Sequence, residues 1–150
     1  MHDWLEWEVV TDESKNIKLK DLSGWKLLYF YPKALTSGCT VEAQGFSEMH
    51  PEFERMGVHI IGISPDQPET LRRFKDKVGI PFLLVSDPDH KLAQAFGVWK
   101  EKNMYGKKTM GIERSTFLID PEGKITKEWR KVKAAGHAAQ VLSALREIIR

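Results

Sequence analysis

Three runs of apolar residues mark the predicted centre of a β-sheet. Residues 26–31 read KLLYFY and stop at Pro32, residues 58–64 read VHIIGIS, and residues 81–86 read PFLLVS. Continuous apolar runs of this length are typical of strands that are covered on both faces. All three segments are therefore predicted to be strands, and the first leads directly into the segment that holds the chain's cysteine.

Two pairs of shorter segments, one before and one after the three apolar runs, predict antiparallel hairpins. Residues 5–10 and 17–19 are separated by the polar run TDESKN, which favours a short hairpin ahead of the main sheet. Residues 115–120 and 124–129 flank Pro-Glu-Gly at positions 121–123. Proline and glycine in that order are typical of a tight turn, so the two flanking segments are predicted to pair.

Helical spacing of apolar residues appears between the predicted strands. Residues 41–56, 68–78, 90–96 and 136–149 each place apolar side chains on one face of a helix. Pro51 is expected to kink the first of these helices or to start a new segment, because proline has no amide hydrogen to donate. Alternating strands and helices, a hairpin and a final helix predict one α/β domain over residues 1–150, with a mixed sheet and helices on both faces.

Composition limits the classes of partner. The 23 basic and 21 acidic residues are mixed along the chain, so a nucleic-acid partner is not expected. No run of about 18 apolar residues occurs, which argues against a membrane span. The first ten residues lack the pattern of a signal peptide, and the lone cysteine cannot form an internal disulfide, so we expect a cytoplasmic protein. The five histidines include no close pair, and no metal site is expected.

The single cysteine, Cys39, lies in the predicted turn between the strand 26–31 and the helix 41–56. A thiol at a helix N-terminus faces unpaired backbone N–H groups and the positive end of the helix dipole, which both favour the thiolate. The Thr36 hydroxyl could donate a hydrogen bond to that thiolate, and Gly38 would let the backbone approach closely. From the residues alone, a reactive thiol and an inert buried cysteine both remain open.

The residues around Cys39 resemble the active-site signature of the peroxiredoxins. Residues 30–43 read FYPKALTSGCTVEA, with Pro, Thr and Cys at the family's P-x-x-x-T-x-x-C spacing. The FYPK lead and the GCT-x-EA continuation are similar to the bacterioferritin comigratory protein subfamily, also called PrxQ. Over residues 19–149, further matches follow in the family's order: GVHIIGIS, SDPD, AFGV and RSTFLID. The resemblance implies a thioredoxin-like fold.

The resemblance also assigns roles to individual residues. It makes Cys39 the peroxidatic cysteine, Thr36 a group that binds the peroxide and the thiolate, Pro32 a shield of the thiolate, and Arg114 the activating cation. Arginine suits that role because it stays charged and its planar fork can contact the thiolate and the peroxide oxygens together. Gly38 joins Thr36 and Arg114 as a substrate-binding residue.

Glu42 and the positions of the family's second cysteine complete this interpretation. Glu42 either orients Arg114 by a hydrogen bond or only complements the start of a helix. Gln44 stands where many PrxQ proteins carry a resolving cysteine, and Ala93 lies in the segment where others carry it. No internal disulfide can form, so the resemblance implies a one-cysteine enzyme that an external thiol regenerates. That thiol is expected to be a thioredoxin-like protein or a small molecule.

The implied activity is a thiol-dependent peroxidase that reduces hydrogen peroxide and organic hydroperoxides through a sulfenic acid on Cys39. No metal or organic cofactor is expected, and the chain is expected to be a monomer or a weak homodimer. Two alternatives from other classes stay open: a peroxide-sensing or binding module on the same fold, and an inert domain with a buried thiol. Residues 99–110, which are rich in lysine, are expected to form a loop near the active-site strand; this loop could border the substrate mouth, but an ordinary solvated loop is favoured.

Overall fold

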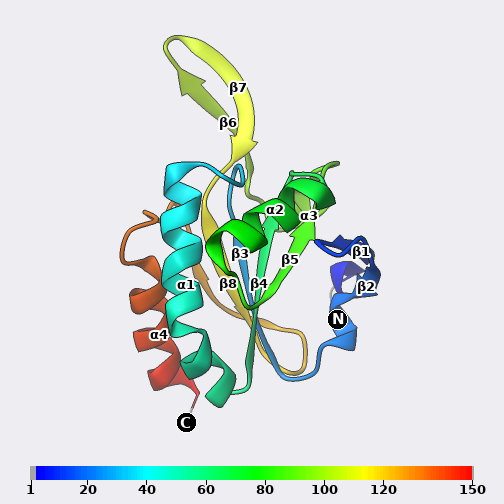
Figure 1. Ribbon diagram of the computed structural model, residues 1–150, viewed down its shortest axis with the longest axis vertical. Coiled ribbons are helices and arrows are strands. Elements are labelled where there is room, and N and C mark those ends of the chain that lie inside the picture. The colour runs from blue at the N-terminus through cyan, green and yellow to red at the C-terminus, as the bar shows by residue number, and fades with distance from the viewer. Residues whose placement is uncertain (1–2, 150) are drawn as a thin grey trace.

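The fold is built on a seven-stranded mixed sheet with the strand order β2-β1-β5-β4-β3-β8-β9 (Figure 1). It was obtained as a computed structural model, which describes residues 3–149. The strands are β1 (Glu8–Thr11), β2 (Asn16–Lys18), β3 (Trp25–Phe30), β4 (Val58–Ser64), β5 (Leu83–Ser86), β8 (Ser115–Ile119) and β9 (Ile125–Trp129). The strands β3, β4 and β5 run parallel, and the remaining pairs are antiparallel. The predicted central strands and both predicted hairpins are therefore confirmed.

Helices cover both faces of this sheet, as the sequence predicts. The helices α1 (Ser37–Arg55), α2 (Pro68–Val78) and α4 (His137–Ile148) pack on one face. The short helix α3 (Lys91–Ala95) and the 3₁₀ segments η1 (Asp3–Leu5) and η2 (Leu19–Asp21) lie on the other. None of the helices within residues 3–149 is long and apolar enough to cross a membrane.

Strand β3 divides the core into two clusters because its side chains alternate between the faces of the sheet. Leu27 and Tyr29 pack under α1, α2 and α4, whereas Leu28 and Phe30 pack beneath α3 and the N-terminal segment. All four side chains are buried. This central position explains the unbroken apolar run in the sequence, and it fixes the strand end from which the cysteine loop begins.

Helix α1 begins earlier than predicted. It starts at Ser37, four residues before the expected position, so Cys39 lies in its first turn and not in the preceding loop. The helix continues through Pro51, so no new helix starts there, and the other expectation for Pro51, a kink, stays a prediction. A proline removes one backbone donor from a helix, and the packed helix of 19 residues tolerates that loss.

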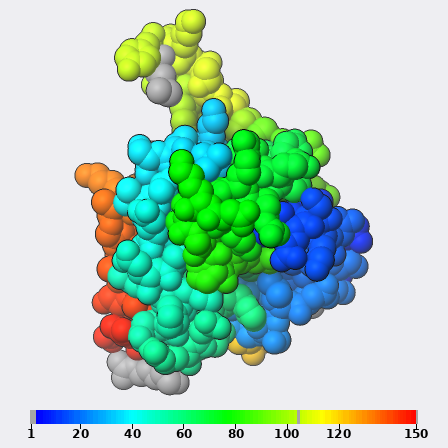
Figure 2. Space-filling view, viewed as in Figure 1, coloured from blue at the N-terminus to red at the C-terminus, as the bar shows by residue number. Residues whose placement is uncertain are grey.

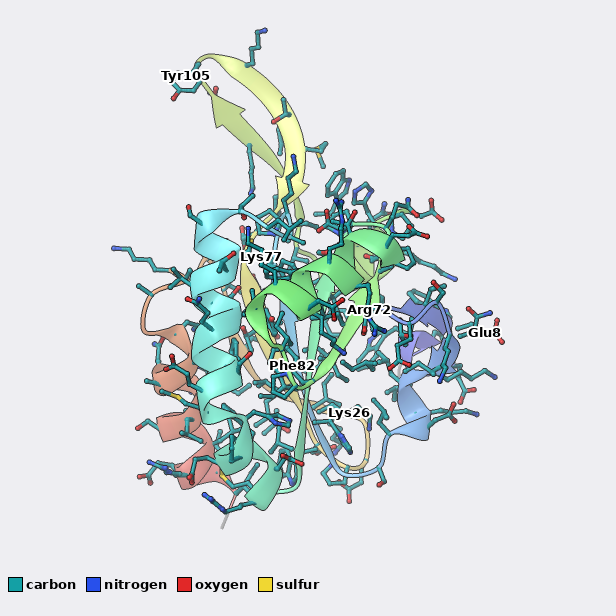
Figure 3. The ribbon with its side chains drawn as sticks, viewed as in Figure 1. Glu8, Lys26, Arg72, Lys77, Phe82 and Tyr105 are labelled. Atoms are coloured by element: carbon teal, nitrogen blue, oxygen red, sulfur yellow. The ribbon has the colours of Figure 1, made fainter. Side chains whose placement is uncertain are left out.

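The expected loop at residues 99–110 is instead a β-hairpin, so that prediction was wrong. Strands β6 (Trp99–Met104) and β7 (Lys107–Ile112) pair antiparallel around Tyr105 and Gly106. Both turn residues have positive φ, at 55° and 79°, as a two-residue hairpin turn of the I′ type requires. The hairpin stands out from the body of the molecule with Tyr105 at its tip (Figures 2 and 3). Because most of its described side chains are exposed and several are charged, it lacks the apolar alternation that would have predicted strands.

Candidate active site around Cys39

The Cys39 thiol is buried, although it belongs to a surface helix. Cys39 is the third residue of α1, and only 1% of its surface is exposed. It packs in the core cluster together with Tyr31 and Ala43. In the loop that precedes it, Leu35 and Thr36 are exposed. The sulfur therefore lies one layer below the surface, beneath the turn that joins β3 to α1.

Arg114 connects the thiol to a buried carboxylate. Its Nη2 donates a hydrogen bond to Cys39 Sγ at 3.3 Å, and its Nη1 donates to Glu42 Oε1 at 2.5 Å. Glu42 has a fully buried side chain one helical turn after Cys39, and Arg114 has a side chain that is 16% exposed. A planar guanidinium held by one carboxylate and pointed at one sulfur is a fixed positive charge beside the nucleophile.

Burial sets the electrostatics of this pair. Loss of solvent raises the pKa of Glu42 to about 7, against the opposing attraction of Arg114. Glu42 Oε2 has no hydrogen-bond partner among the described residues, which agrees with the desolvation of this carboxyl. For Arg114, burial lowers the pKa, but Glu42 and Cys39 more than compensate and raise it. Arg114 therefore stays cationic, while burial makes the charged form of Glu42 less favourable than that of an exposed carboxylate.

The other predicted site residues lie around the same turn. Thr36 is the N-cap residue of α1, and its hydroxyl donates to the Lys33 carbonyl oxygen at 2.7 Å instead of to the sulfur. Gly38 faces the arginine, since a Cβ added to it would lie 3.4 Å from Arg114 Nη2. Pro32 is half-buried in the loop before α1. The structure thus brings Cys39, Arg114, Glu42 and Gly38 together and directs the Thr36 proton elsewhere.

Asp66 supports the loop between β3 and α1, and it was not predicted from the sequence to be a site residue. Its Oδ2 accepts hydrogen bonds from the Ala34 amide at 2.7 Å and from the Ser64 hydroxyl at 2.8 Å. The residue next to Ala34, Leu35, has φ of +68°, a conformation that non-glycine residues adopt only at a cost. Asp66 follows β4 at the sheet edge where β3 also ends. Because the ends of neighbouring parallel strands lie side by side, this position could have indicated that Asp66 lies near the loop before Cys39. This carboxylate fixes a strained turn immediately before the thiol.

Comparison with known proteins places this site in a family. Residues 2–128 match the AhpC/TSA family. The peroxiredoxin Bcp of Bacillus subtilis is 51% identical over 142 residues, which are 94% of this chain and 90% of that protein. The peroxiredoxin Bcp of Xanthomonas campestris is 53% identical over 122 residues, which are 81% of this chain and 76% of that protein. The chain belongs to the AhpC/TSA family. Within it, the chain is a peroxiredoxin of the Bcp/PrxQ group and thus a thiol peroxidase.

Solved structures of PrxQ proteins share the fold of this peroxiredoxin. A structure of the Xanthomonas campestris bacterioferritin comigratory protein superposes with a TM-score of 0.94 at 44% identity. The superposition covers 99% of this chain and 95% of the Xanthomonas campestris chain. A PrxQ structure from Xylella fastidiosa gives a TM-score of 0.95 at 40% identity, covering 100% of this chain and 94% of its own. The thioredoxin-like peroxiredoxin fold implied by the sequence resemblance is confirmed.

The two usual resolving positions lie apart from the thiol in this peroxiredoxin. Gln44 is exposed on α1, five residues beyond the buried Cys39. Ala93 is buried in α3, on the opposite face of the sheet. Cys39 is the chain's one cysteine, so neither position supplies a second sulfur. No group of three or more His, Cys, Asp or Glu side chains within residues 3–149 is arranged to hold a metal ion.

Removing the Asp66 carboxylate is expected to slow the reaction of Cys39 with peroxide. In Asp66→Ala the Ala34 amide loses its acceptor and the strained turn loosens, so we expect a rate about tenfold lower. Asp66→Asn keeps an acceptor oxygen and should retain most of the rate. Sulfenate formation and hydrogen exchange of the Ala34 amide would be measured in both variants. An Asp66→Ala protein with the parent rate and the parent Ala34 protection would contradict this role for Asp66.

Proposed function

We propose that this peroxiredoxin reduces hydrogen peroxide and organic hydroperoxides through the Cys39 thiolate. The single observation that carries the proposal is the Arg114 guanidinium, which donates to Cys39 Sγ at 3.3 Å while Glu42 holds its other branch. A fixed cation beside the sulfur favours the anion that attacks, and it also favours the oxygen charge that develops as the O–O bond breaks.

The chemical step forms one bond and breaks another. The thiolate sulfur attacks the terminal peroxide oxygen, an S–O bond forms, and the O–O bond breaks. The departing oxygen takes the electron pair and a proton, and leaves as water from hydrogen peroxide or as an alcohol from an organic hydroperoxide. The sulfur is oxidised by two electrons and becomes a sulfenic acid.

Thr36 and Gly38 would bind the peroxide in this mechanism. The Thr36 hydroxyl gives its proton to the Lys33 carbonyl oxygen, so its remaining lone pairs are left to accept a hydrogen bond from the peroxide O–H. The missing side chain of Gly38 keeps free the space in front of Arg114 Nη2. We assign Pro32 to shielding the thiolate from water.

Regeneration requires a thiol from outside the chain, because Cys39 is the only cysteine. The external thiol forms a mixed disulfide with Cys39 and releases water, and a second thiol then releases the Cys39 thiolate. Repeated peroxide reduction in the presence of a thiol tests the proposal. A peroxide sensor, the alternative on this fold, would consume one equivalent of peroxide and stop.

A cysteine at position 44 is expected to convert the protein to an internally resolved form. Five residues along a helix separate Gln44 from Cys39 by about 7.5 Å in rise, so the first turn must unwind before a disulfide can close. Helix ends open at little cost. We expect Gln44→Cys to form an internal disulfide with one equivalent of peroxide, and to resist further oxidation to the sulfinic acid in excess peroxide.

The matched control for this change is Glu48→Cys, which places a thiol at another exposed position of α1, beyond the reach of Cys39. Mass spectrometry after stepwise addition of peroxide would follow both variants and the parent. Equal sulfinate yields in all three proteins, with no internal disulfide in Gln44→Cys, would refute this interpretation of position 44.

Three further expectations remain predictions. They are a single domain over residues 1–150, a monomer or weak homodimer, and a cytoplasmic location. The last is supported by the single free thiol, which suits a reducing compartment.

A further inference from the structure

A groove of about 1010 Å³ lies between the base of the β6–β7 hairpin and the segment that follows β9. Arg114, whose guanidinium contacts the Cys39 sulfur, forms part of its lining. Two backbone hydrogen bonds connect the walls of the groove to the segment that contains Arg114. Val132 N donates to the Arg114 carbonyl oxygen at 3.0 Å, and Glu113 N donates to the Val98 carbonyl oxygen at 2.8 Å. In Figure 1 the hairpin rises from the end of the domain at which α1 begins.

The groove is strongly cationic. Its basic lining residues are Lys100, Lys102, Arg114, Arg130 and Lys131. Among the described residues, its acidic lining residues are Glu101 and Glu113. Glu101 lies 3.8 Å from Lys108 across the hairpin, so its charge is already partly compensated. The groove therefore presents a net positive charge to any ligand that enters it.

Three of these basic side chains have no acidic partner among the described residues. Arg130 pairs with Glu128 at 2.9 Å and donates to the carbonyl oxygens of Phe96 and Gly97, which makes it part of the wall. In the part of the chain that the structure describes, by contrast, Lys100, Lys102 and Lys131 form no ion pair. Three unpaired ammonium groups around one groove suit a ligand with more than one negative charge.

The lining favours a charged ligand. Among the described residues that line the groove, Val132 is the only branched aliphatic one, and the others are charged or glycine. A ligand held there therefore meets the charged ends of the lysine and arginine side chains. Its volume is of the size that proteins use for small molecules. Charge and size together indicate a small polyanion.

We propose that this groove binds the carboxylates of a small anionic thiol, which is the reductant of the Cys39 sulfenic acid. The inference rests on the proposed function, because it assigns the class of the second substrate. The thiolate of the ligand attacks the sulfenic sulfur, an S–S bond forms, and the S–O bond breaks. The hydroxyl group leaves with a proton as water. A second molecule of the thiol attacks the ligand sulfur and releases the Cys39 thiolate, so two thiols become one disulfide.

The test separates the thiol step from the peroxide step. Cys39 is first oxidised with one equivalent of hydrogen peroxide and then mixed with mercaptosuccinate, a dianionic thiol, or with the neutral 2-mercaptoethanol. The groove variant is Lys100→Glu/Lys131→Glu. The matched control is Lys107→Glu/Lys124→Glu, which makes the same charge change at exposed residues outside the groove.

We expect mercaptosuccinate to reduce the groove variant about tenfold more slowly than the parent, because attraction by two ammonium groups is replaced by repulsion. The rate with 2-mercaptoethanol should stay within about twofold of the parent, and the control should match the parent with both thiols. Added salt should slow only the reaction of the parent and the control with mercaptosuccinate. An equal mercaptosuccinate rate in the groove variant and the control would overturn the inference.

Binding of a ligand to the groove can also be measured on the reduced protein, without any catalytic step. Succinate, which carries the two carboxylates without the thiol, should bind the parent and shift the amide signals of Val132 and Gly97. It should bind the control equally and the groove variant much less. Absence of succinate binding to the parent would overturn the groove site even if Cys39 reduces peroxide. Succinate binding without sulfenate formation would instead refute the proposed function and, with it, the role of the groove in reduction.

Discussion

Cys39→Ser is expected to lose all measurable peroxide reduction while it keeps the fold. A serine hydroxyl stays protonated at neutral pH and cannot supply the nucleophile that a thiolate does. The hydroxyl is nearly the size of the thiol, and Arg114 Nη2, which donates to Cys39 Sγ, can still donate to an oxygen there. The free energy of unfolding should therefore change by only about 1 kcal/mol. Peroxide consumption in the presence of a thiol, together with thermal unfolding, measures both quantities.

The control for this substitution is Ser37→Ala, an exposed residue in the same helical turn. It should keep the parent activity, which separates loss of the sulfur from disturbance of the start of α1. Substantial turnover in Cys39→Ser would place the chemistry on another residue. An inactive Ser37→Ala protein would show that any change in this turn abolishes activity.

Arg114→Ala is expected to slow the oxidation of Cys39 by peroxide about a hundredfold or more. The substitution removes the group that donates to the sulfur at 3.3 Å and leaves the buried Glu42 without its cation. The reaction slows because the fixed positive charge that stabilises the developing oxygen anion is gone. Stopped-flow oxidation by hydrogen peroxide would measure the rate in the parent and in the variant.

Two companion variants isolate the effect of the Arg114 contact. Arg130→Ala removes a positive charge from a neighbouring segment, but Arg130 contacts Glu128 and two backbone carbonyl groups and not the sulfur. It should leave the oxidation rate of Cys39 nearly unchanged. Glu42→Gln keeps Arg114 and removes its carboxylate partner, so its rate should fall between those of the parent and Arg114→Ala. An Arg114→Ala protein that reacts with peroxide at the parent rate would remove Arg114 from the mechanism.

The central strands could be predicted because burial on both faces leaves an unbroken apolar run. Strand β3 has that run, and it lies between β4 and β8 with buried side chains on each face. The β6–β7 hairpin could not be predicted in this way, because a projecting hairpin buries little and its strands are held by main-chain pairing and by the turn at Tyr105 and Gly106. The Tyr-Gly pair is a weak turn signal without apolar alternation around it.

The site also contains residues that the neighbouring sequence predicts and residues that only the fold brings to the thiol. The placement of Cys39 near a helix start follows from a strand, a turn and a helical pattern in sequence. Arg114, alone in the sequence, is no different from an exposed strand arginine. The register of the sheet brings it to the thiol, since Phe30 pairs with Ser115 and Arg114 therefore lies beside the end of β3. Asp66 escaped notice because its partner, the Ala34 amide, is a backbone group 32 residues away.

We propose that the folded environment makes Cys39 reactive, and one comparison of rates tests this. The second-order rate of Cys39 with hydrogen peroxide would be measured for the native protein and for the same protein unfolded in denaturant, where the thiol is that of an ordinary cysteine. We expect a native rate at least about a thousandfold higher, because the helix start, Arg114 and the positioned turn act only in the folded protein. Equal rates in the two states, or a slower native rate from burial of the thiol, would contradict it.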